Sequence, residues 1–168
     1  RGSLKYLADI GRLDQVSRGV YTLPEVWEDE FVSIQERYKR GVFALDTALF
    51  LHDLTDRTPH KFHMAFPYGY NTSSPKAAGI LCSCKKEPYY SLGIALVDTP
   101  AGNTVRAYNA EKTLCEILKP ISHTDIQIIT DAFKRYAGRK DKNIPLLSEY
   151  AHQLRVEKRL RPYLEVLL

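Results

Sequence analysis

The sequence YNAEKTLCEIL, residues 108–118, marks the point at which strand patterns give way to helical patterns. Asn109 can cap a helix that carries Leu114 and Ile117 on one face. Glu111 lies in the first turn of that helix, where the helix dipole favours an anion. This stretch therefore separates a sheet-forming part of the chain from a helical part.

Further helices are expected after this stretch. Residues 124–127, TDIQ, fit a capping box at the start of a helix that Gly138 ends. Asn143 precedes a second helix that carries Leu147, Tyr150, Ala151 and Leu154. A final short helix covers residues 156–168 and is expected to be kinked, or to begin, near Pro162.

The segments before residue 108 contain two helices and then several strands. Helical spacing covers residues 28–38 and 46–54, and strand patterns cover residues 60–66, 79–83, 89–97 and 104–107, with a turn-rich loop over 68–75. We therefore expect an α+β body over residues 25–168, with a small, mostly antiparallel sheet followed by a C-terminal helical bundle.

The first 24 residues have a different pattern. Residues 3–10 have the spacing of a short amphipathic helix, and residues 12–24 read as two short strands of a hairpin. A helix followed by a basic hairpin is the layout of the last part of a winged helix-turn-helix, whose recognition helix enters the major groove. We expect residues 1–24 to be that recognition helix and wing, with the first two helices of the module missing from this chain.

Charge is distributed unevenly along the 168 residues, whose 24 Lys and Arg exceed the 20 Asp and Glu by four. Residues 1–24 hold four basic and two acidic residues, residues 25–118 hold 10 and 12, and residues 119–168 hold 10 and six. Both ends are thus basic, which suits separate positive surfaces for a polyanion. A basic and helical C-terminal third of a chain is, however, often only a solvent-exposed helix face.

The candidate DNA-binding residues come from the two basic ends. Arg, Lys, Ser and Tyr hydrogen-bond phosphates and base edges. The N-terminal candidates are Arg1, Ser3, Lys5, Tyr6, Arg12 and Arg18, and the candidates in the body are Lys134, Arg135, Arg139 and Lys140. The second group straddles a helix end, where cations also complement the helix dipole, so a structural role is equally compatible with the pattern.

Enzymatic and metal-binding motifs have little support. The chain has no G-x-S-x-G elbow, P-loop or G-x-G-x-x-G fingerprint. His60 and His63 would point to opposite faces of a strand, and Cys82-x-Cys84 has no second pair at zinc-finger spacing. We therefore expect no catalytic residues, no metal and no cofactor.

We expect the protein in the cytoplasm and without membrane contact. The chain has only three cysteines, no signal peptide and no apolar run near the roughly 18 residues of a membrane span.

Five stretches of the sequence, in this order, resemble one bacterial protein family. They are RGVYTLP (18–24), RYKRGVF (37–43), TALFLHDLTDRTP (47–59), FPYGYN (66–71) and YNAEKTLCEIL (108–118). On these motifs the chain resembles the AbiEi antitoxins of type IV toxin–antitoxin systems, which act in abortive phage infection. The resemblance covers the chain from about residue 3 to its end.

The resemblance implies a non-enzymatic autorepressor that binds inverted repeats in its promoter DNA and counteracts a cognate nucleotidyltransferase toxin without needing a stable complex. We expect a monomer. Asp53, Asp56 and Arg57 within the third motif are candidates for the antitoxin function, or they fix the turn at Thr58-Pro59. The alternative is an enzymatic body that reverses or blocks the toxin's nucleotide transfer. A third possibility is a module that sequesters the toxin directly, for which an exposed apolar patch would be the sign.

Overall fold

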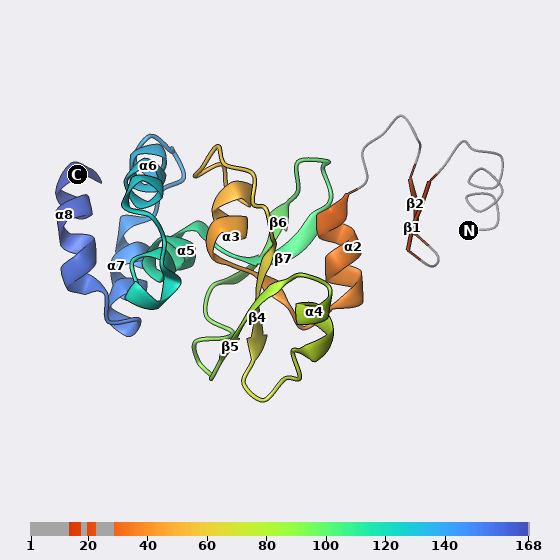
Figure 1. Cartoon of the computed structure of the whole chain (residues 1–168). Coiled ribbons are helices and arrows are strands. Elements are labelled where there is room, and N and C mark those ends of the chain that lie inside the picture. The colour runs from red at the N-terminus through yellow and green to blue at the C-terminus, as the bar shows by residue number, and fades with distance from the viewer. Residues whose placement is uncertain (1–13, 18–19, 23–28, 168) are drawn as a thin grey trace. The chain divides into compact units, whose positions relative to one another are not determined.

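The computed structural model of the chain describes residues 14–17, 20–22 and 29–167 (Figure 1). The chain forms two compact units, one made of Arg1–Lys39 and Asp98–Val105, the other of Arg40–Val97 and Arg106–Leu168. The domain boundary expected between residues 24 and 25, and the recognition helix expected over residues 3–10, lie outside the described residues.

The first unit contains the expected hairpin. Strands β1 (Asp14–Ser17) and β2 (Val20–Thr22) pair antiparallel, with Asp14 opposite Thr22. The hairpin prediction is thus confirmed, while a winged helix-turn-helix stays a prediction.

Helix α2 (Glu30–Arg37) begins at Asp29, whose side chain serves as the N-cap in the first unit. Asp29 Oδ1 accepts from Val32 N at 3.4 Å. Its other oxygen, Oδ2, accepts from Thr99 Oγ1 and Asn103 Nδ2, each at 2.7 Å. One carboxylate therefore both starts the helix and fixes the turn over residues 99–103.

The second sheet has the strand order β5-β4-β3-β7-β6. Its strands are β3 (Val42–Phe43), β4 (His63–Pro67), β5 (Leu81–Lys85), β6 (Ile94–Asp98) and β7 (Thr104–Tyr108). Strands β3 and β4 are antiparallel, whereas β3 pairs parallel with β7 and β4 pairs parallel with β5.

The expectation of a mostly antiparallel sheet is therefore wrong, because the sheet is mixed. Two parallel strands need a crossover connection, and between β4 and β5 that crossover contains α4 (Ser73–Ala77). The sequence there, NTSSPKAAG, is rich in turn residues, which suggested a loop.

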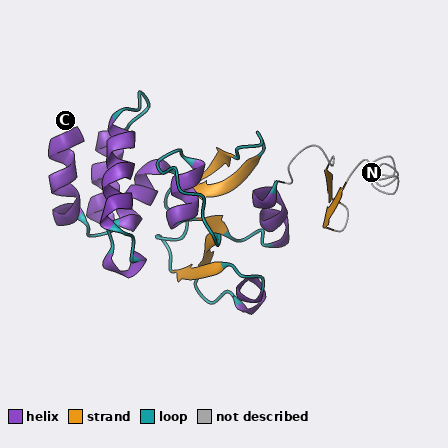
Figure 2. Cartoon of the chain, turned by 45° about the horizontal axis from the view of Figure 1, so that its top comes forward, coloured by secondary structure: helices purple, strands orange, loops and turns teal. Residues whose placement is uncertain are grey.

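The remaining helices are α3 (Leu45–Leu51), α5 (Ala110–Ile117), α6 (Ile126–Ala137), α7 (Ile144–Gln153) and α8 (Glu157–Leu167), with a short 3₁₀ turn, η1 (Pro120–Ser122). The α+β class is confirmed. Helices α6, α7 and α8 lie side by side at the C-terminal end (Figure 2). Among the described residues, no helix is both long enough and apolar enough to cross a membrane.

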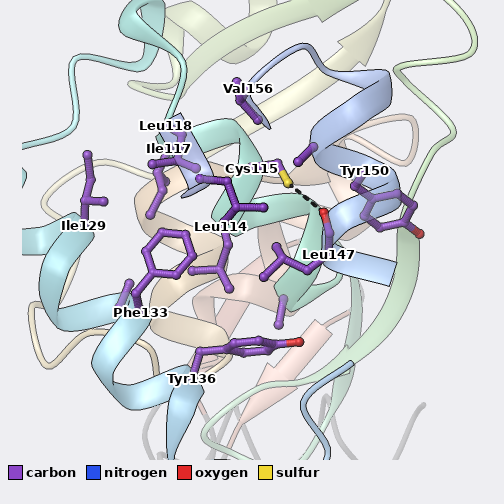
Figure 3. Close-up of a cluster of buried hydrophobic side chains, with 14 of the residues drawn as sticks. Leu114, Cys115, Ile117, Leu118, Ile129, Phe133, Tyr136, Leu147, Tyr150 and Val156 are labelled. Carbon is purple, nitrogen blue, oxygen red and sulfur yellow. Dashed lines mark hydrogen bonds between the residues drawn. The ribbon is translucent and has the colours of Figure 1, made fainter. Parts of the chain in front are cut away.

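Helix α5, from the stretch YNAEKTLCEIL, is the centre of the helical core. All eight of its residues are buried, so it has no solvent face. Leu114 contributes to a cluster with Phe133 of α6 and Leu147 of α7 (Figure 3). Cys115 Sγ donates to Leu147 O at 3.6 Å, and the Phe133 and Tyr163 rings stack with centroids 4.4 Å apart.

Side-chain caps start three of these helices. Asn109 Oδ1 accepts from Lys112 N at 2.8 Å and Asn143 Oδ1 accepts from Leu146 N at 3.1 Å, which confirms both expected starts. Asp125 caps α6, so that helix begins one residue later than a Thr124 cap would give. Pro162 lies inside α8 rather than at its start.

Candidate nucleic-acid interface

The candidate site residues fall into a group that the structure describes and a group that it does not. Arg1, Ser3, Lys5, Tyr6, Arg12 and Arg18 lie outside the residues whose side chains are described. The described candidates are Asp53, Asp56 and Arg57 after α3, and Lys134, Arg135, Arg139 and Lys140 at the end of α6. All seven belong to the second unit.

The basic candidates gather where α6 ends. Lys134 and Arg135 lie in its last turn, and Gly138 caps it as the sequence predicts. Arg139 and Lys140 follow at once. Cations in this position complement the partial negative charge of the helix C-terminus.

The acidic candidates follow the end of α3, in a Schellman motif. Asp53 N donates to Phe50 O at 3.1 Å, and Leu54 N donates to Leu49 O at 2.9 Å. Asp53 occupies the left-handed position of this motif, with φ at 57°. Its side chain is exposed, while Leu49 and Leu54 are buried. The backbone role of Asp53 is therefore to end the helix and return Leu54 to the core.

Two contacts bring these sequence-distant groups together. Arg135 Nη2 lies 4.0 Å from Asp56 Oδ2. Arg139 Nη1 donates to His52 O at 2.9 Å. Residues 52–57 and 134–140 therefore form one surface, which we call the α3–α6 surface.

The cations of the α3–α6 surface differ in how far they are neutralised. Arg139 binds Asp141 with both Nε and Nη2, each at 2.8 Å, and this pair lowers the pKa of Asp141 to about 2. Arg135 Nε donates to Asp131 at 2.9 Å. Both arginine charges are thus largely balanced by neighbouring carboxylates.

The two lysines among the basic candidates, in contrast, can still contact a phosphate. Lys134 and Lys140 are exposed, and neither has a carboxylate partner in the part of the chain that the structure describes. A compact ammonium group on a flexible stem is suited to contact a phosphate as a point charge. The end of α6 therefore offers two lysines without a carboxylate partner among the described residues, beside two arginines that are already bound.

A buried charged network around α5 was not found from the sequence. Lys112 is fully buried, and its Nζ donates to Tyr89 O at 2.7 Å and Leu92 O at 2.8 Å. The same ammonium lies 3.7 Å from the centroid of the Tyr108 ring. Burial lowers the pKa of Lys112 to about 8. At Gly93, with φ at +81°, a side chain would place its Cβ 2.7 Å from Lys112 Cβ, so this close approach needs glycine.

Glu116, one turn after Lys112, is also buried and only 2% exposed. Its Oε2 lies 2.7 Å from Lys85 Nζ. Oε1 has no hydrogen-bond partner among the described residues. His63 lies within the electrostatic reach of this pair, and burial lowers the pKa of His63 to about 4 even though Glu116 opposes that shift.

Glu111 connects α5 to the next two helices. It is 8% exposed and accepts a hydrogen bond from Tyr136 Oη at 2.5 Å. Tyr136 Oη in turn accepts from Asn143 N, the cap of α7, at 2.7 Å. Burial and the bond to Glu111 raise the pKa of Tyr136. The contacts of Lys112 and Glu111 thus hold elements together.

Metal coordination has no geometric support in the described chain. No group of three or more His, Cys, Asp or Glu side chains there could hold an ion. Cys82 and Cys84 are free thiols on the edge strand β5.

No family model and no curated protein matches the chain.

Proposed function

We propose that the chain is a DNA-binding transcriptional autorepressor and the antitoxin of a nucleotidyltransferase toxin. The five ordered motifs that resemble AbiEi antitoxins support this function, and so does the excess of basic residues at both ends of the chain. The observation that carries the DNA-binding part is the exposure of Lys134 and Lys140, without carboxylate partners among the described residues, at the end of α6.

In this proposal the two ends of the chain have different tasks. The N-terminal candidates read the promoter, and the body adds contacts to the phosphate backbone through the α3–α6 surface. Such contacts hold the protein on the duplex and carry no sequence information by themselves. Their contribution therefore appears in the salt dependence of binding rather than in the choice of sequence.

A titration with promoter DNA tests this division. Replacing Lys134 and Lys140 with Gln removes two phosphate contacts, and each contact contributes about 0.9 to the slope of log K against log salt. The double variant should therefore bind the promoter more weakly, with a slope reduced by about 1.8. Lys86→Gln, which removes an exposed lysine from the loop after β5, is the matched control and should leave the slope unchanged. An unchanged slope in the double variant would count against the α3–α6 surface as a DNA contact.

The antitoxin part of the proposal is non-enzymatic. Asp53 ends α3 through its backbone conformation, and the Asp56 carboxylate lies 4.0 Å from Arg135, so each residue has a structural role. Asp53→Gly combined with Asp56→Asn keeps the backbone geometry and removes both charges. Cells that express the toxin should still be rescued by this variant. Loss of rescue, with promoter binding intact, would favour the enzymatic alternative instead.

A further inference from the structure

A groove opens where the parallel strands β4 and β5 begin, within the second unit. Its volume of about 540 Å³ is within the range of small-molecule binding pockets. Its walls come from the first residues of α3, the segment 76–82 and the η1 turn. The lining residues that matter below are Asp46, Lys61, Lys76, Leu81, Ile121 and His123.

Two lysines supply positive charge to this groove. Lys61 and Lys76 are exposed, and neither ammonium group has a hydrogen-bond or carboxylate partner among the described residues. An ammonium group on a flexible stem can contact a phosphate as a point charge. The ring of His123 is exposed on the same groove and can donate a further hydrogen bond. The groove can therefore hold a phosphate group.

A carboxylate, that of Asp46, lines the groove as well. Burial raises the pKa of Asp46, and Arg57 opposes that shift. His63 also lines the groove and is uncharged at neutral pH, because burial lowers its pKa to about 4. A carboxylate repels a phosphate but accepts hydrogen bonds from hydroxyl groups. The polar lining thus suits a ligand that carries a phosphate at one end and hydroxyl donors at another position.

Two aliphatic side chains give the groove an apolar wall. Ile121 is 81% exposed and Leu81 is 48% exposed. Ser122 Oγ lies 2.8 Å from Lys119 O and 3.0 Å from Ile117 O, so the turn that carries Ile121 is ordered without a ligand. Apolar residues exposed together in this way mark ligand-binding grooves. A flat ring packed on this wall would remove apolar surface from water without having to order the turn.

Two residues that line the groove have a strained backbone. Leu45 has φ at 50° and His123 has φ at 52°. A side chain in this left-handed region has an unfavourable steric contact with its own backbone, and such residues cluster at ligand-binding sites. Leu45 directly precedes Asp46, and His123 presents its own ring, so the strained positions coincide with the polar lining of the groove.

We infer that this groove binds a nucleotide. The phosphate lies at Lys61 and Lys76, the ribose hydroxyls face Asp46, and the base packs against Leu81 and Ile121. Inorganic phosphate would leave the carboxylate and the apolar wall without partners, and a purely apolar ligand would leave the two ammonium groups unpaired. A nucleotide carries all three kinds of group. No residue of the α3–α6 surface lines this groove, and the inference does not depend on the proposed function.

Calorimetric titration of the purified full chain with AMP, ribose 5-phosphate and inorganic phosphate tests the inference. AMP should bind at least about 10-fold more tightly than ribose 5-phosphate, because only AMP carries the base. Lys61→Gln with Lys76→Gln should weaken AMP binding by at least about 10-fold, because the phosphate loses both cations. Ile121→Ser should bring the affinity for AMP close to that for ribose 5-phosphate, because the base loses its wall.

Two variants with the same kinds of change elsewhere are the controls. Lys86→Gln with Lys158→Gln removes two exposed lysines that do not line the groove. Leu96→Ser removes a leucine that is 75% exposed on β6, at the opposite edge of the sheet from β5. Both should bind AMP as the wild type does, and all variants should unfold at the wild-type urea midpoint.

Three results would each overturn the nucleotide site. They are no binding of AMP by the wild type at millimolar concentration, equal wild-type affinity for AMP and ribose 5-phosphate, and wild-type AMP affinity after the double change at Lys61 and Lys76. An unchanged preference for AMP in Ile121→Ser would refute the placement of the base.

Discussion

Replacing the buried Lys112 with Met tests whether the charged network around α5 is a structural element. Methionine has a similar length and similar helix propensity, so the packing of the stem against Gly93 is retained. What is lost is the ammonium group, which donates to Tyr89 O and Leu92 O and lies over the Tyr108 ring. The substitution thus isolates the polar end of the side chain.

The expected cost follows from those contacts. A carbonyl group left without its donor costs about 1–3 kcal/mol. The hydrogen bonds to the Tyr89 and Leu92 carbonyl groups are only partly buried, so the cost of losing each is expected near the lower end of this range. The contact with the aromatic ring adds about 0.5–1 kcal/mol. We expect the free energy of unfolding to fall by about 3 kcal/mol, a large share of the roughly 5–15 kcal/mol of an ordinary domain.

Urea unfolding followed by circular dichroism measures this change. Lys158→Met, on the exposed face of α8, is the control, and its effect should be within about 0.5 kcal/mol of zero. A fall of less than about 1 kcal/mol for Lys112→Met would refute the reasoning, because the two carbonyl bonds would then contribute little.

Other substitutions give further tests. Asp53→Gly should raise the free energy of unfolding by about 0.5 kcal/mol, because glycine adopts the left-handed conformation without strain; a lower urea midpoint would contradict this. Tyr136→Phe should cost about 2 kcal/mol in the same assay, because the buried Glu111 loses its donor, and an unchanged midpoint would show that this bond is dispensable. The unfolded chain protonates His63 at its ordinary pKa of 6.5 and the folded chain only near 4, so stability should fall by at most about 3 kcal/mol as the pH drops through this window. His63→Gln should show a smaller fall across the same pH range, and equal falls would exclude His63 as the cause.

Local signals in the sequence predicted the helix ends well. Asn109, Gly138 and Asn143 each act through backbone groups within four residues, so the pattern contains all that is needed. The hairpin of β1 and β2 is local in the same sense.

Features that depend on residues far apart in the sequence could not be predicted from local patterns. The parallel pairing of β4 with β5 depends on a crossover through α4, a five-residue helix whose sequence resembles a turn. Lys112 and Glu116 read as polar residues of an amphipathic helix, because the sequence does not show that Tyr89, Leu92 and Lys85 would provide their partners. The charge of a residue is thus a poor guide to its burial where a distant loop supplies the hydrogen bonds.

The candidate site shows the same limit. The sequence singled out residues 53–57 and 134–140 separately, about 80 positions apart, and nothing local connects them. Only the fold brings Asp56 to Arg135 and His52 to Arg139. The same contacts show that the two arginines are already bound by neighbouring groups, whereas Lys134 and Lys140 have no carboxylate partner within the described ranges, a distinction that composition cannot make.

The most direct test of the proposed function is the affinity of the full chain for its own promoter duplex, compared at one physiological salt concentration with a scrambled duplex of equal length. Specific DNA-binding proteins prefer their site over other sequences by at least about 10³-fold. The account predicts a preference of this order for the promoter. Equal affinity for the two duplexes would contradict it.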